Sequence, residues 1–554
     1  MERSSFDSHW RELGDYILPR RTRFTASDRN RGDKRNQNII DSTAKFAATT
    51  LRSGLHAGLT SPARPWMRLT TPDPDMAEFG PVKVWLHTVT QRMLTLFIQS
   101  NLYNVLPVVY GDMGVFGTAA MAVLEDEQEV FRCYPFPVGS YAIGLDSRQV
   151  AGTFLREYSL TVRQVVEEFG LQPNGTIDWT PISSSVKSLW EQGSFDAAID
   201  VCWLVLPNEE ANPRRLGSRF MKWSSLHFET GTQGTDRAVN LERDKFLRVS
   251  GFNEFPFMVP RWEITGEDSY GTDCPGMTAL GDVKQLQIMQ RKKGQALAKM
   301  VDPPLQGPSS LMTQKTSLLP GDITYVDVRD GVSGLKPIHE VSLPYAAIVE
   351  DIREVQFRIR RAFYEDLFLM LAQSEQTQPV TAREIEERHE EKLLALGPVL
   401  ERTNDELLDP LIDRVFNIML RKGLVPQAPP ELEGVDLKVE YISVMAQAQR
   451  LVGLTGQDRF MTTMLGLIEQ FPETRYKIDT NRVVDNYGEI LGIDPRIVRP
   501  TEEATALLDA DRQAQAQAAQ AAQAKDMSTA LKNAGTTPMD EDTALTRLVQ
   551  GVTG

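Results

Sequence analysis

The sequence has little cysteine and no long uninterrupted apolar run. Its three cysteines, Cys133, Cys202 and Cys274, lie far apart among 554 residues, without a CxxC spacing or a Cys/His cluster. This spacing argues against a zinc site and a disulfide framework, and favours assembly in a reducing, intracellular compartment. The most apolar stretch, residues 105–124, is interrupted by Asp112 and by glycines, so no run of about 18 apolar residues is present to span a membrane.

The chain also lacks an excess of positive charge and the motifs of common enzymes. The net charge is −15 and the pI is about 5.1, which argues against a protein that coats nucleic acid. An acidic wall would still suit a protein through which DNA passes, because it repels phosphate and prevents sticking. None of the patterns GxxxxGK(S/T), GxSxG or HExxH occurs. We therefore expect no enzyme and no cofactor, and the charges in the first ten residues argue against a signal peptide.

What is present is the composition of a large globular protein. Hydrophobic residues make up 41% and charged residues 24% of the chain, and the length predicts several domains. Helical periodicity covers residues 36–60 and 81–100, whereas strand-like alternation covers 129–160 and much of 198–265, including 198–207 and 257–264. The N-terminal half is therefore predicted to mix α and β structure.

A basic cluster follows a short helical pattern at the start of the chain. The pattern places Phe6, Trp10, Leu13 and Ile17 on one side of a helix. The cluster favours a solvated arm over a contact with nucleic acid or an acidic partner. Its members are Arg20, Arg21, Arg23, Arg29, Arg31, Lys34 and Arg35.

Two amphipathic patterns, at residues 277–301 and 345–371, predict a helical hairpin. The segment between them is rich in proline and glycine and contains one clear strand candidate, Asp322–Val328. Neither helix has enough neighbours within the segment to cover its apolar stripe, which predicts a protein that assembles side by side with copies of itself. The first stripe is Val283, Leu286, Met289, Leu297 and Met300, with Lys284, Arg291, Lys292 and Lys299 opposite, and the second is Ile348, Ile352, Val355, Ile359, Phe363 and Met370.

Helical signals continue after a polar interruption at residues 372–380. Thr381 and Glu384 have the spacing of a capping box, and so do Thr403 and Glu406, which predicts two helix starts. A bend is expected at the Gly-Pro pair 397–398.

The remaining segments have weaker signals. The helical pattern ends at Gly423, and residues 436–497 are predicted to be helical with glycine and proline breaks. From residue 500 onward the chain is rich in alanine and glutamine, which is equally compatible with a frayed helix and with a disordered tail.

A run of carboxylates, Glu125–Asp126–Glu127, is the one candidate for metal binding. Such oxygens could bind a hard cation, but a solvated turn after the apolar strand at 119–124 is the favoured interpretation. His389 lies in an Arg/Glu-rich helical pattern and is expected on the surface. Two ion pairs at i,i+4 spacing are expected in the second hairpin helix, namely Glu354 with Arg358 and Arg361 with Glu365.

Several stretches together resemble the portal proteins, or head-to-tail connectors, of short-tailed tailed bacteriophages. The resemblance covers most of the chain from residue 10 to about 425, and two stretches, 59–66 and 276–282, are fairly specific in combination. The similar stretches are 10–13, 16–20, 41–44, 53–55, 59–62, 65–66, 100–103, 116–119, 276–282 and 381–385.

This resemblance implies an α+β, predominantly helical fold with the wing, stem, clip and crown regions of a portal-ring subunit. It also implies a tunnel loop that faces DNA. The implied regions are an N-terminal α/β wing at 1–275, stem helices at 276–301 and 345–371, a clip at 302–344, the tunnel loop at 372–381, a kinked wing helix at 382–429, a crown at 430–499, and a C-terminal extension, partly helical or disordered, at 500–554.

The resemblance further implies a ring, typically a dodecamer, at one capsid vertex of the virion, assembled in the host cytoplasm. Double-stranded DNA would pass through it during packaging and ejection. The implied partners are the terminase large subunit, then a tail adaptor protein, and the major capsid and scaffolding proteins, with no membrane. The implied site residues are Gln373, Ser374, Glu375, Gln376, Thr377 and Gln378 in the tunnel loop, Asp322, Tyr325, Asp327 and Arg329 for clip docking, and a basic face of Lys284, Arg291 and Lys299 that lines the channel or a subunit interface.

Two alternatives stand beside this hypothesis. Another tail or adaptor component would be structural too, but would not account for the similar stretches and the kinked helix. A virion-associated enzyme acting on nucleic acid or on the cell wall belongs to a different class, and turnover abolished by one carboxylate substitution would identify it.

Overall fold

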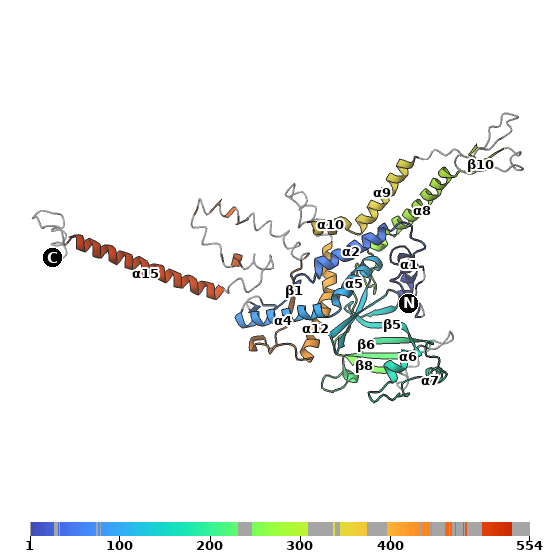
Figure 1. The fold of residues 1–554 in the computed structure, drawn as a ribbon. Coiled ribbons are helices and arrows are strands. Elements are labelled where there is room, and N and C mark those ends of the chain that lie inside the picture. Colours follow the sequence, from blue (N-terminus) through green and yellow to red (C-terminus); the bar gives the residue numbers. More distant parts are fainter. Residues whose placement is uncertain are drawn as a thin grey trace, which may run out of the picture. The chain divides into compact units, whose positions relative to one another are not determined.

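The computed structural model places most of the chain (Figure 1). By contacts between Cα atoms the chain divides into two compact units, the first comprising Met1–Thr70 and Trp85–Val452 and the second Thr71–Val84 and Gly453–Gly554. The structure describes residues 2–26, 32, 34–73, 76–77, 79–230, 246–307, 336–337, 344–373, 396–432, 434–443, 445, several positions between 460 and 484, and 501–534.

The first helix is held in the core of the first unit. Helix α1 (Glu2–Tyr16) buries Trp10 and Leu13, and the following Ile17 is also fully buried, as the periodicity predicts. The Trp10 indole nitrogen donates a hydrogen bond of 3.0 Å to the carbonyl of Phe116. An indole in an apolar core needs such an acceptor, so this bond fixes α1 against its neighbour.

The basic cluster after α1 is not simply a solvated arm. The Arg21 guanidinium donates to the carboxylate of Asp112, with an Nε–Oδ1 distance of 2.9 Å, and Asp112 is almost completely buried. The prediction of a solvated arm is therefore wrong for Arg21, because a buried carboxylate needs a charged partner. Arg29 and Arg31 lie outside the described residues.

Two helices form the centre of the first unit. Helix α2 (Thr43–Leu59) begins later than the predicted residue 36, and it contacts the largely buried helix α5 (Leu102–Phe116). Helix α4 (Gly80–Gln99) lies before α5 in the chain. The helix agrees with the periodicity predicted over 81–100, and it buries Trp85, Val89, Met93 and Phe97.

Two antiparallel sheets follow. Strands β2 (Ala120–Asp126) and β3 (Val130–Phe136) form a hairpin, and β9 (Phe257–Met258) pairs with the other edge of β2. The predicted strand at 257–264 is thus only two residues long. Prolines at 256 and 260 flank it and cannot donate to the ladder.

The larger sheet has five strands in sequential order. Its second and third strands pair over eight residues, and β6 has the predicted bounds. An apolar cluster lies between the sheet and the short helices α6 (Val162–Val165) and α7 (Ser184–Glu191). The strands are β4 (Tyr141–Leu145), β5 (Ala151–Thr161), β6 (Ala198–Pro207), β7 (Trp223–Glu229) and β8 (Arg248–Phe252).

The predicted helical hairpin is present. Helix α8 (Pro275–Val301) and helix α9 (Tyr345–Ala362) lie side by side (Figure 1), and two short strands, β10 (Leu305–Gln306) and β11 (Lys336–Pro337), pair beyond them. The intervening strand candidate Asp322–Val328 lies outside the described residues.

The second hairpin helix is broken, contrary to prediction. Helix α9 ends at Ala362, and α10 (Glu365–Gln373) begins after Tyr364, whose φ of 54° is left-handed. The break removes the helical i,i+4 spacing, so Glu365 lies 3.7 Å from Arg360 instead of pairing with Arg361. The other predicted pair is confirmed, with Glu354 and Arg358 3.9 Å apart.

A second helix start was also predicted wrongly. Thr403 has helical φ and ψ angles, and its hydroxyl donates to the Val399 carbonyl four residues earlier. The chain continues through a π-helical turn (Asn404–Leu408) into α12 (Asp409–Arg421). The predicted helix end is confirmed by Gly423, whose φ of 68° suits glycine.

The end of the first unit contains a strand where a helix was predicted. Strand β12 (Lys438–Tyr441) pairs antiparallel with β1 (Met67–Thr70), and the ring of Tyr441 stacks on the buried Trp66. Lys438-Val-Glu-Tyr alternates polar and bulky residues, which suits a strand once a partner is available.

In the second unit, the Ala/Gln-rich segment forms one helix. Helix α15 (Thr501–Ala534) comprises 34 residues and has no apolar stripe, and its leucines 507 and 508 are about half exposed. The helical alternative for this segment is therefore the one found. In the parts of the chain with described positions, no helix is long and apolar enough to cross a membrane.

Candidate assembly surface on the helical hairpin

The base of the hairpin is fixed by close backbone packing. Gly276, in the first turn of α8, lies against the end of α5, and a Cβ atom there would sit 2.7 Å from the Val115 Cα and overlap the Val115 carbonyl oxygen. The Cys274 thiol donates to the same carbonyl, at 3.2 Å. Contacts with α5 therefore position the start of α8.

A single carboxylate joins three helices at this base. Asp41 precedes α2, and its Oδ1 accepts hydrogen bonds from the backbone N–H and the hydroxyl of Thr43. Its Oδ2 accepts from the side-chain amides of Gln290 in α8 and Gln356 in α9, each at 2.9 Å. Gln287 of α8 completes the node by accepting from the Asp41 N–H and donating to its carbonyl.

The node stabilises the ionised form of Asp41. Burial alone would raise the pKa of the carboxyl, but the hydrogen bonds from Thr43, Gln356 and Gln290 outweigh burial and hold the pKa below its ordinary value. The start predicted for α2 at residue 36 is wrong, because the N–H and the carbonyl of Asp41 bond to the Gln287 side chain instead of to helical partners.

The two hairpin helices contact each other through an apolar seam with charged edges. Val283 and Leu286 of α8 and Val355 of α9 are buried. Arg358 lies 3.2 Å from Asp282, and the ammonium of Lys293 lies 5.5 Å from the centre of the Tyr345 ring. These contacts lie on facing sides of α8 and α9, and they define the register of the antiparallel pair.

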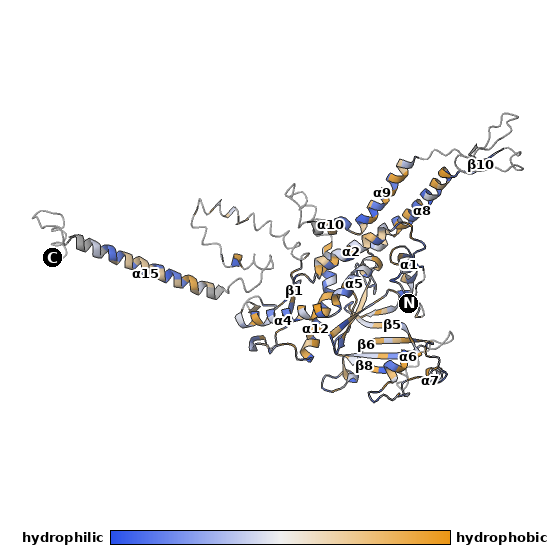
Figure 2. Cartoon of the chain, viewed as in Figure 1, coloured by the Kyte–Doolittle hydropathy of each residue, from blue (hydrophilic) through white to orange (hydrophobic). Residues whose placement is uncertain are grey.

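The distal halves of both helices leave apolar side chains exposed. The predicted stripe of α8 is buried at its base, but Leu297 and Met300 are about half exposed, because only α9 is available as a neighbour there. Figure 2 shows apolar segments at the distal ends of α8 and α9. This exposure confirms that the hairpin does not bury its own stripes, and it indicates a surface for a partner. The exposed side chains in the distal halves are Ile288, Leu297, Met300, Val301 and Tyr345, and Phe357 is exposed nearer the base.

The predicted basic face of α8 divides into two parts. Lys284, near the base, lies 2.5 Å from the Glu12 carboxylate of α1 and stacks over Tyr16, so its charge is already paired within the chain. Arg291 and Lys299, further along α8, are exposed. The three predicted residues therefore share one helix but not one environment.

Most of the other predicted site residues lie outside the described part of the chain. Gln373 is the last residue of α10, so the helix extends into the predicted loop. The loop residues Ser374, Glu375, Gln376, Thr377 and Gln378, the residues Asp322, Tyr325, Asp327 and Arg329, the first capping box and His389 lie outside the described residues.

The break between α9 and α10 adds a feature that the sequence pattern does not indicate. Beside it lies an open pocket of about 440 Å³, between the base of α8 and the end of α9. Acidic and basic side chains share its wall, so it has mixed charge. The charged lining residues are Glu263, Asp273, Asp282, Arg358 and Arg361.

The carboxylate run lies at the β2–β3 turn and makes ion pairs with α12. Asp126 Oδ1 accepts from the backbone N–H groups of Gln128 and Glu129, which shapes the turn. Glu125 lies 2.7 Å from Arg421, so its charge is paired with a cation. Among the described residues no cluster of three His, Cys, Asp or Glu side chains could hold a metal ion.

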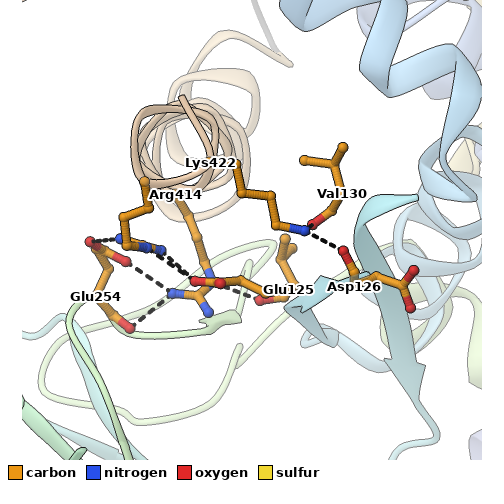
Figure 3. Close-up of polar contacts among 8 residues, drawn as sticks. Glu125, Asp126, Val130, Glu254, Arg414 and Lys422 are labelled. Carbon is orange, nitrogen blue, oxygen red and sulfur yellow. Dashed lines mark hydrogen bonds and ion pairs between the residues drawn. The ribbon is translucent and has the colours of Figure 1, made fainter. Parts of the chain in front are cut away.

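Figure 3 shows that this contact extends along α12. The buried Arg414 donates to the Val123 carbonyl and to the Glu254 carbonyl, and Lys422 donates to the carbonyls of Asp126 and Val130. Burial lowers the pKa of Arg414 to about 10, with Glu254 opposing the shift. The network fixes α12 to the β2–β3 hairpin and has a structural role.

The described residues are about half helical and include several small antiparallel sheets, which is consistent with an α+β fold. The family model for the bacteriophage head to tail connecting protein matches residues 1–498, and the chain therefore belongs to this family. Members of this family are structural components of the virion at the head–tail junction, so this chain is a connector and not an enzyme.

Two phage proteins are similar to this chain over nearly their whole length. The portal protein of Salmonella phage epsilon15 is 46% identical over 521 residues, which cover 94% of this chain and 90% of that protein. The probable portal protein of Bordetella phage BPP-1 is 41% identical over 556 residues, covering 100% of this chain and 97% of that protein.

Proposed function

We propose that this chain forms a closed ring at one capsid vertex and that the ring is the conduit for double-stranded DNA during packaging and ejection. The observation that carries this proposal is the exposed apolar surface on the distal halves of α8 and α9. Exposed apolar side chains concentrated on two neighbouring helices are typical of a contact surface. Copies related by rotation would each cover the hairpin of the next.

The proposed regions follow the family layout. Residues 1–275 and 382–429 form the wing, 276–301 and 345–371 the stem, 302–344 the clip, and 430–499 the crown, with the extension after 500. Within the first unit, β12 pairs with β1, so residues 438–441 of the proposed crown are joined to the wing. We infer no barrel from α15, since it carries no apolar stripe along which copies could pack.

The proposed partners bind in succession. The clip, with Asp322, Tyr325, Asp327 and Arg329, would dock the terminase large subunit and later a tail adaptor. Residues 374–378, which follow α10, would form a loop that touches DNA. Only one of them, Glu375, is charged, so the loop would not hold phosphate tightly. Major capsid and scaffolding proteins would surround the ring, which would assemble in the host cytoplasm.

Electron microscopy of the purified full-length chain tests the proposal. We expect rings with a central hole, and twelve copies of the 62.2 kDa chain would give a particle of about 750 kDa by native mass spectrometry or mass photometry. A particle of another closed ring size would correct the copy number alone. A chain that stays monomeric or dimeric under assembly conditions would overturn the ring.

A further inference from the structure

The side of α8 that points away from α9 carries cations around one apolar residue. Asp282 and Lys293 mark the side that faces α9, through their contacts with Arg358 and Tyr345. At about 100° per residue, the opposite side carries a different set of residues, which we name the basic face. The basic face consists of Ile288, Arg291, Lys292 and Lys299, all of them exposed.

The basic face has no acidic counterpart on its own helix. Residues 288–301 contain Arg291, Lys292, Lys293 and Lys299 and no carboxylate, which gives a net charge of +4. Among the residues with described side chains, no carboxylate pairs with Arg291, Lys292 or Lys299. Four like charges on one half of a helix repel each other unless a partner supplies negative charge.

The outward side of α9 has the complementary composition. Residues 346–354 contain Glu350, Asp351 and Glu354 against Arg353, which gives a net charge of −2. We name Glu350, Glu354 and the exposed Phe357 the acidic face, since helical periodicity puts them on the side of α9 that points away from α8. The acidic face thus contains carboxylates and one exposed apolar residue, Phe357. The basic face likewise contains cations and one exposed apolar residue, Ile288.

The carboxylates of the acidic face are available to a partner. Glu350 lies 3.7 Å from Arg353, and Glu354 lies 3.9 Å from Arg358. All four side chains are between 46% and 78% exposed, and ion pairs at such exposure are weak. A cation brought from outside can therefore compete with them.

The middle of the basic face lies at the height of Glu350, whereas Lys299 lies about 15 Å further along the hairpin and Phe357 about 9 Å nearer its base than Ile288. In the antiparallel hairpin, Asp282 of α8 lies opposite Arg358 of α9, and Lys293 lies opposite Tyr345. A residue of α8 and a residue of α9 at the same height therefore have residue numbers that add to about 639. Arg291 and Lys292 are therefore level with residues about 347–348, within one helical turn of Glu350. For a ring axis parallel to the hairpin, rotation preserves height, so Arg291 and Lys292 of one copy would meet Glu350 of the next copy.

We infer that the basic face of α8 binds the acidic face of α9 on the next copy of this chain, with Ile288, Arg291 and Lys292 at the height of the turn around Glu350. The inference rests on the proposed ring and states which surfaces join its subunits. It assigns Arg291 and Lys292 to the subunit interface and not to the DNA channel. Such a contact uses two different surfaces of one chain, which is the arrangement that closes into a ring.

Paired charge-reversal variants test the inference. The first variant carries Arg291→Glu, Lys292→Glu and Lys299→Glu, and the second carries Glu350→Lys and Glu354→Lys. Each alone would place like charges across every interface, and we expect the assembled fraction to fall at least about tenfold at moderate salt. An equimolar mixture should recover rings, because alternating copies restore opposite charges at each contact of an even-numbered ring.

The controls separate the possible failures. A variant with all five reversals in one chain should also form rings, whatever the copy number. A matched variant with three reversals on exposed loops, Arg148→Glu, Arg214→Glu and Lys222→Glu, should assemble like the original chain. Circular dichroism of the unassembled chains checks that the reversals leave the fold intact, as their exposure predicts.

Three results would overturn the inference. Rings that form normally from the first variant, with DNA packaging lost, would place the basic face in the channel. A mixture that remains unassembled while both variants are folded would refute the pairing of these two faces. Absence of rings from the unaltered chain would refute the proposed ring itself, a failure distinct from the other two.

Discussion

Gly276 of α8 lies so close to Val115 of α5 that no side chain fits between them. The glycine is near the root of the hairpin, where α8 leaves the body of the first unit. We expect Gly276→Ala to destabilise the unassembled subunit by about 1–3 kcal/mol, because the added methyl group must displace backbone. The measurement is the free energy of unfolding in denaturant.

A second glycine in the same helix supplies the control. A Cβ at Gly281 would meet no atom within 4 Å. Gly281→Ala should therefore leave stability unchanged or raise it by about 0.5–1 kcal/mol, since alanine favours helix. Equal effects of the two substitutions would show that packing against Val115 does not position α8.

The Asp41 node predicts a pH-dependent contribution to stability. Asp41→Asn places an amide opposite two donating glutamines and should cost about 1–3 kcal/mol near neutral pH. The pKa of Asp41 is lowered in the folded chain, so the contribution is fully present above the ordinary carboxyl pKa and is lost as the pH falls through the folded value. Unfolding curves from pH 7 down to pH 3 for both chains would measure this.

The matched control for the node is Asp146→Asn, a carboxylate in an exposed turn. Its substitution should alter stability much less and leave the hairpin unaffected. A difference between Asp41→Asn and the original chain that grows with acidification would contradict the proposed role of the ionised carboxylate.

The three cysteines should react only when the chain unfolds. Cys133, Cys202 and Cys274 are all buried and form no disulfide, and burial raises the pKa of Cys133 and of Cys274 to about 12. Thiolate is the reactive form, so a thiol reagent at pH 8 should modify fewer than about one cysteine per folded chain and all three in denaturant. Rapid modification of the folded chain would show that the regions around them open readily.

Local patterns predicted much of this fold because their signals need no distant partner. The stripe of Trp10, Leu13 and Ile17 and the first hairpin helix, predicted at 277–301, are periodic over several turns, and the structure contains both helices. The resemblance of short stretches likewise identified the family, which the match over residues 1–498 confirms. Periodicity also predicted that the distal stripes would lack cover, as the exposure of Met300 shows.

Several of the wrong predictions depend on residues far away in the sequence. Thr403 and Glu406 have the spacing of a capping box, but Glu406 instead accepts from Arg261, which lies 145 residues earlier. Lys438–Tyr441 forms a strand only because β1 supplies a partner. No local pattern indicates the pairing of Lys284 with Glu12. The sequence alone therefore could not show that Lys284 has a different environment from Arg291 and Lys299.

Arg261 provides the sharpest test of such long-range contacts. It is 6% exposed, and it donates to Glu406, to the Asp268 carbonyl and to the Gln149 carbonyl. Arg261→Ala should cost about 3–5 kcal/mol in the free energy of unfolding, because it leaves the Glu406 carboxylate without its partner. Arg163→Ala, which breaks an exposed pair, should cost about 0–1 kcal/mol, and similar losses for both would show that the buried pair does not hold the π-helical turn.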